Sequence, residues 1–161
     1  MTRIWFVAAA LAAVACSRAT APPVAEGPSP ARLRGLDFTA SLEVAESAPQ
    51  SLEGDVRIMN RGTSAETLVF GDGCPVRLRV YEVRGSRVAP VWEGPESCPD
   101  GPVSVAIAPG ETGILSIPPT TAPDILRDDL SDGPYRITVW LAPDDRVIEI
   151  EAGEVELRAT R

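Results

Sequence analysis

Short stretches in which apolar and polar residues alternate run through the chain from about residue 35 to residue 159. The clearest is 135–141, where every second residue is apolar. A period of two places one side of a β-strand in a core and the other side in water. About eight to ten such stretches occur, separated by turn signals such as 60–62 and 109–110. The pattern predicts an all-β fold, an antiparallel sandwich of short strands.

Proline and glycine argue against a helical fold. The chain contains 16 Pro and 13 Gly, which interrupt it too often for long helices. β-Branched residues fill the apolar stretches, as is typical of strands. We expect at most one turn of helix, near 125–130, as a crossover between the two sheets.

The first 16 residues have the pattern of an export signal. Arg3 precedes an uncharged run from Ile4 to Ala15, and Cys16 follows. A charged start, a short apolar run and small residues at its end are typical of a secretory signal. The run has 12 residues, whereas a membrane-spanning helix needs roughly 20. We therefore expect residues 1–15 to be a signal peptide.

The end of this signal, residues 13–16, resembles a bacterial lipobox, in which the Cys becomes the acylated first residue. The resemblance implies that Cys16 carries a lipid and holds the protein on the outer side of the cell membrane. Ser17, where an inner-membrane retention signal would have Asp, favours the outer membrane. Ala13 stands where lipoboxes usually have Leu, and Ala-Val-Ala also fits ordinary cleavage. That alternative would leave a soluble protein with a free thiol.

A linker follows the signal. The segment 16–34 contains four prolines among Ala, Ser and Gly, with little apolar periodicity. Such a composition is typical of an extended tether. The expected organisation is therefore a signal at 1–15, an acylated tether at 16–34 and one sandwich domain at 35–159.

The chain has three cysteines, Cys16, Cys74 and Cys98. An odd number in an exported protein needs an explanation. Acylation of Cys16 supplies one and leaves Cys74 and Cys98 to form a disulfide in an oxidising compartment. Two free thiols or a metal pair are the alternatives, although two Cys without His make a poor zinc site.

Charge and missing residue types exclude several functions. The chain has 23 acidic and 15 basic residues, a net charge of −8 and no His; every basic residue is Arg. An acidic surface repels phosphate backbones, so nucleic acid is not an expected partner. Without His or Lys, the chain lacks the usual general base, Schiff-base and phosphate-binding groups. We expect no enzymatic activity, no cofactor and no metal.

Three side chains are candidates for contact with a partner. Trp140 is out of phase with the apolar residues of 135–141, so it faces away from their side of the sheet. An exposed aromatic residue there would be a contact point, and the alternative is packing against an Arg stem. Arg77 and Arg79 alternate with apolar residues and share an outward face, where they either form a basic recess or pair with nearby carboxylates.

Several short pieces occur in an order found in a known family. They are an apolar strand ending at Asn60, the segment 74–81 beginning Cys-Pro, Val91-Trp92, Pro109-Gly110, and 133–137 beginning Gly-Pro-Tyr. The order resembles the BsuPI-type proteinase-inhibitor domain over about residues 38–157. The resemblance implies an immunoglobulin-like sandwich and inhibition of a protease. The inhibitory loop would be 93–101, which is closed by Cys98.

Together these observations predict a lipid-anchored, non-enzymatic domain that binds another protein at the cell envelope. One alternative is a periplasmic proteinase inhibitor, whose partner would be a protease. The other is a structural subunit of an envelope complex.

Overall fold

The computed structural model describes residues 31–45, 48–83, 89–127 and 129–159. The expected signal at 1–15, the expected lipid site Cys16 and residues 17–30 of the expected linker lie outside these ranges. Ten strands occur in the described part: β1 (Ala31–Leu33), β2 (Leu36–Ala45), β3 (Ser51–Asn60), β4 (Glu66–Phe70), β5 (Arg77–Glu82), β6 (Trp92–Gly94), β7 (Val103–Ile107), β8 (Thr112–Thr121), β9 (Gly133–Leu141) and β10 (Ile148–Leu157).

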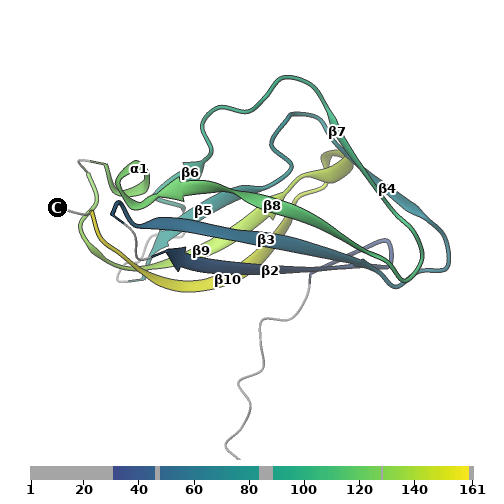
Figure 1. Ribbon diagram of the computed structural model, residues 1–161, viewed down its shortest axis with the longest axis horizontal. Coiled ribbons are helices and arrows are strands. Elements are labelled where there is room, and N and C mark those ends of the chain that lie inside the picture. The colour runs from purple at the N-terminus through teal and green to yellow at the C-terminus, as the bar shows by residue number, and fades with distance from the viewer. Residues whose placement is uncertain (1–30, 46–47, 84–88, 128, 160–161) are drawn as a thin grey trace, which may run out of the picture.

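Two antiparallel four-stranded sheets form the fold, with strand orders β1-β2-β3-β8 and β10-β9-β5-β6. They lie one behind the other in Figure 1, and the two-stranded ribbon β4-β7 extends from one end. Strand β8 returns to pair with β3 after four intervening strands, a crossing between sheets that is typical of Greek-key sandwiches. The expected immunoglobulin-like all-β sandwich is confirmed.

The core lies between the two sheets and follows the period-two pattern. The apolar residues of 135–141 all point inward, as predicted, and the residues between them belong to the other face. Opposite them, β2 and β3 contribute a matching set. The fully or almost fully buried side chains of the two facing layers include Leu36, Phe38, Leu52, Val56, Ile58, Leu78, Val80, Ile137, Val139 and Leu157.

The sheet begins at Ala31 rather than at residue 35. Residues 31–33, which we expected in the linker, form strand β1 and pair with β2 through Ala31↔Phe38 and Leu33↔Leu36. Arg34 and Gly35 make the turn between them, with φ of 49° and 79°. A two-residue hairpin turn of this kind needs positive φ at both positions. Glycine adopts that conformation without strain.

The single α-helix of the described residues is α1 (Ala122–Leu126), which begins and ends earlier than the expected turn near 125–130. Thr121 caps its N-terminus, because its side chain accepts from the Asp124 backbone N–H while the Asp124 carboxylate accepts from the Thr121 backbone. This reciprocal capping fixes the start of the helix. No helix in the described part of the chain is long and apolar enough to span a membrane.

Asn60 holds together the corner where β3, β7 and the β7–β8 turn meet. Its side chain is fully buried. Its Nδ2 donates to the carbonyls of Ser64 at 2.8 Å and Ile107 at 2.9 Å, and its Oδ1 accepts from the Gly62 N–H at 2.8 Å. Its backbone N–H also donates to the Glu111 carbonyl at 3.0 Å. The buried amide therefore satisfies backbone groups of the β3–β4 turn and of β7, and the Asn60 backbone N–H adds the β7–β8 turn.

Candidate interaction site

The three predicted contact residues lie together on the outer face of the second sheet. Strands β5 and β9 pair so that Arg77 lies opposite Trp140 and Arg79 opposite Thr138. The Cζ atoms of Arg77 and Arg79 lie 5.6 Å and 4.7 Å from the centroid of the Trp140 ring. Guanidinium groups at these distances make cation–π contacts. We call Arg77, Trp140 and Arg79 the Arg–Trp stack.

Both arginines of the stack are also paired with carboxylates, which was one of the two alternatives that the sequence left open for them. Arg79 Nε lies 2.8 Å from Glu93 and its Nη1 3.4 Å from Glu149, while Arg77 Nη2 lies 2.7 Å from Asp72. Trp140 is half-buried beneath the arginines and is therefore not an open aromatic contact point. Two arginines here face three carboxylates, so the stack does not form a basic recess.

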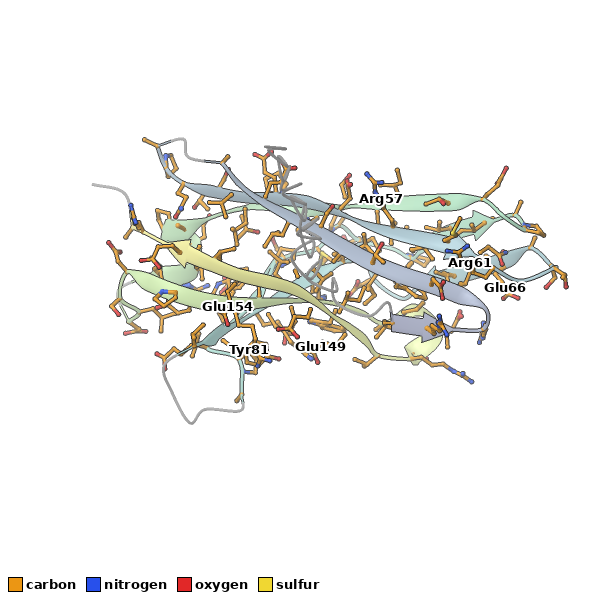
Figure 2. The ribbon with its side chains drawn as sticks, turned by 90° about the horizontal axis from the view of Figure 1, so that it is seen from below. Arg57, Arg61, Glu66, Tyr81, Glu149 and Glu154 are labelled. Carbon is orange, nitrogen blue, oxygen red and sulfur yellow. A yellow bond between two sulfur atoms is a disulfide. The ribbon has the colours of Figure 1, made fainter. Side chains whose placement is uncertain are left out.

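A second layer of polar contacts continues the stack along the same face. Glu149 on β10 accepts hydrogen bonds from Thr138 at 2.7 Å and from the Tyr81 hydroxyl at 2.9 Å. Arg136 lies over the Tyr81 ring, with its Cζ 4.7 Å from the centroid. Tyr81 and Glu149 lie on the side of the molecule opposite Arg57 (Figure 2). We did not predict this layer, although the polar positions of β10 alternate in the sequence.

Ionised Glu149 is favoured by this environment. Partial burial raises the pKa of Glu149, but hydrogen bonds from Thr138 and Tyr81 and the positive charges of Arg79 and Arg136 outweigh it and lower the pKa below its ordinary value. Burial and the hydrogen bond to Glu149 raise the pKa of Tyr81. The hydroxyl therefore stays protonated and donates to a carboxylate at neutral pH.

We expect Glu149→Gln to lower the free energy of unfolding by about 1 kcal/mol at pH 7, since it weakens partly exposed charge-assisted bonds. A carboxylate with a lowered folded-state pKa stabilises the fold above its unfolded pKa, about 4.3 for Glu, and loses this as the pH falls through the folded pKa. Urea unfolding from pH 7 to pH 3 should show the difference shrinking towards acid pH. Glu151→Gln on the same strand is the matched control, and an equal loss for it would contradict the assignment.

The predicted disulfide is present and fastens a loop to the stack. Cys74 and Cys98 are bonded, with their Cα atoms 5.3 Å apart and a sequence separation of 24. The loop after β6, residues 95–102, contains Cys98, and we call it the braced loop. Arg77 reaches it twice, because Nη2 donates to Cys98 Sγ at 3.2 Å and Nη1 to the Pro95 carbonyl at 3.5 Å. The stack, the disulfide and the loop thus form one connected unit.

Within 31–159, apart from the positions that the structure does not describe, no group of three or more His, Cys, Asp or Glu side chains is arranged to hold a metal ion. The unit presents a charged face beside a constrained loop, and a cavity of about 170 Å³ lies in this face against Arg77 and Trp140.

Comparisons with known proteins add little to this picture. No family model and no curated protein matches the chain. Among solved structures, a β-glucosidase from Listeria innocua with glucose bound is 20% identical with a TM-score of 0.41, over 73% of this chain. β-Glucosidase 3B from Thermotoga neapolitana with glycerol is 17% identical with a TM-score of 0.40, over 75% of this chain. The chain spans 16% of the length of each enzyme, and nothing about their activity is carried over.

Proposed function

We propose that this chain is exported, is anchored through an acylated Cys16, and binds another protein at the cell envelope without catalysing a reaction. The observation that carries the binding proposal is the braced loop, which the disulfide and Arg77 hold beside the Arg–Trp stack. A loop that is already ordered loses little conformational entropy on binding. The paired charges of the stack keep the neighbouring face rigid.

A non-enzymatic role agrees with the state of the charged groups on this face. Arg77, Arg79 and Glu149 already have partners. A general acid or base needs a tuned pKa and reach to a substrate. The carboxylate with the most partners, Glu149, has a lowered pKa, which opposes a role as general acid.

Proteinase inhibition is the second candidate, and the braced loop also favours it. The loop covers most of 93–101, the Pro- and Gly-containing segment closed by Cys98 that is the candidate inhibitory loop. Inhibitors that present a preformed loop avoid the cost of ordering it. A structural role in an envelope complex would use the same surface without a protease as partner.

The test is site-specific cross-linking in cells that export the full chain. A photo-crosslinking amino acid replaces Ser97, an exposed position of the braced loop, or Ser116, an exposed position on β8 of the other sheet. We expect a discrete adduct from position 97 and none from position 116. The adduct should leave the membrane fraction when Cys16→Ser removes the acylation site.

The outcomes separate the candidates. An adduct that contains a protease, together with inhibition of that protease at micromolar protein, favours the inhibitor. An adduct with a non-protease favours a binding or assembly role. Equal labelling from positions 97 and 116, or none from the loop, contradicts binding through the loop, and an unacylated mature N-terminus contradicts the anchor.

A further inference from the structure

A cavity of about 340 Å³ lies behind the braced loop, between the loop and the segment from β8 to α1. Its volume is within the range of ligand sites. Its walls combine one aromatic ring with three proline rings and several polar groups. The lining residues used below are Trp92, Pro95, Glu96, Pro119, Asp124 and Arg127.

Trp92 is the central side chain of this region. A second cavity, of about 550 Å³, is also lined by Trp92 and Arg127. The Trp92 ring rests on Gly94, where an added Cβ would overlap it. Its indole Nε1 is covered, and no described residue accepts a hydrogen bond from it. A covered donor without an acceptor is unfavourable, so a ligand carbonyl that reached this N–H would satisfy it.

The charge around Trp92 is predominantly negative. Among the described residues that line the two cavities, four are acidic, Glu82, Glu96, Asp124 and Asp129, and one is basic, Arg127. Arg127 is paired with Glu96 across the mouth of the first cavity. A ligand that carries positive charge at its ends would complement this rim.

We infer that the groove around Trp92 binds a proline-rich segment of a partner protein that carries Arg or Lys beside its prolines. A polyproline II strand has no internal hydrogen bonds, so its carbonyls are free to accept from the Trp92 Nε1. Proline-rich segments dock in grooves lined by aromatic residues, because they are extended before they bind. Pro95 and Pro119, which line the same cavity as the indole, offer further flat apolar contacts.

The inference deepens the proposed binding function and rests on it, since it names what the partner presents to the inner side of the braced loop. Its test needs only the full-length purified chain in detergent and synthetic peptides. The probe is a peptide of six prolines with an arginine at each end. Peptides with glutamates at the ends, or with alternating glycine and serine in place of the prolines, are the matched comparisons.

Titration calorimetry should give measurable binding of the arginine–proline peptide, weakened at least about tenfold by Trp92→Ala, as for a central aromatic anchor. Pro119→Ala, an exposed wall position, should weaken binding without affecting the fold, and Pro109→Ala, in a distant turn, should not change it. The glutamate-ended peptide should bind at least about tenfold more weakly. Circular dichroism checks that each variant is folded.

Three results would overturn the inference. The wild-type chain does not bind the peptide at millimolar concentration, or neither Trp92→Ala nor Pro119→Ala weakens binding, or all three peptides bind equally. If binding appears only after the four prolines at 22, 23, 28 and 30 are replaced, the groove holds the chain's own N-terminal segment and a partner is excluded. The cross-link from position 97 tests the binding function separately, so the two proposals can fail independently.

Discussion

Replacing Asn60 with alanine is expected to lower the free energy of unfolding by about 3 kcal/mol. The fully buried side chain makes three hydrogen bonds, to the carbonyls of Ser64 and Ile107 and from the N–H of Gly62. Alanine removes all three, which leaves the Ile107 carbonyl without a partner in the core and the Ser64 carbonyl and Gly62 N–H without one in a partly buried turn. Each such buried group costs roughly 1–3 kcal/mol when its partner is lost. Partial rearrangement of the corner keeps the total below a simple sum.

Urea denaturation of the purified chain measures this change. Asn60→Asp is the matched variant, because it keeps the acceptor for Gly62 but loses the donors to Ser64 and Ile107. We expect it to be at least as destabilising at pH 7 as alanine, since it also buries a charge. Arg61→Ala, which removes an exposed ion pair with Asp37 at 3.2 Å, should change stability by less than about 1 kcal/mol. An unchanged unfolding midpoint for Asn60→Ala would contradict the role of Asn60.

Removing the disulfide is expected to cost about 3.5 kcal/mol, the loop-closure term for a loop of this length. The double variant Cys74→Ala with Cys98→Ala frees the chain over a sequence separation of 24. Arg77 would keep its ion pair with Asp72 but lose its hydrogen bond to the Cys98 sulfur. The braced loop should become mobile, so the adduct from position 97 should weaken together with the stability.

Thermal unfolding of the double variant beside Cys16→Ser checks this expectation. Cys16→Ser leaves the Cys74–Cys98 pair intact and should unfold at the wild-type temperature, apart from any effect of the anchor. Added reductant should lower the melting temperature of Cys16→Ser to that of the double variant. If the double variant has the same melting temperature as the wild type, the disulfide does not stabilise the fold.

Most strands were predictable because they carry a local signal, the alternation of apolar and polar residues. The alternation at 135–141 identified both β9 and its buried face. Strand β1 gave no such signal, because it has only three residues and follows a proline-rich segment. The helical turn was predicted at 125–130, C-terminal to the start of α1. The start is fixed by the capping pair Thr121 and Asp124, whereas the apolar residues Ile125 and Leu126 lie near the end of the helix.

For the candidate site, the sequence predicted which face of its own strand each residue occupies, but not which residues of different strands meet. Period-two alternation placed Arg77 and Arg79 on one face, and phase placed Trp140 on the outside of its own strand. That these three meet depends on the register of β5 with β9, which the sequence of either strand does not specify. The contact of Tyr81 with Glu149 joins residues 68 positions apart and depends on the same tertiary pairing. The cavity around Trp92 likewise exists only because α1 and the braced loop are brought together.

The order in which the sheet would yield to a pulling force follows from the position of β1. With the proposed anchor at Cys16, tension would reach Ala31, the first residue of a strand that makes only three residue pairs with β2. These few pairs can peel away before the long β2–β3 pairing carries any load. Releasing residues 31–35 lengthens the connection by roughly 17 Å. The β1–β2 pairing would then be the first part of the sheet to separate under tension, while the core between the two sheets stays intact.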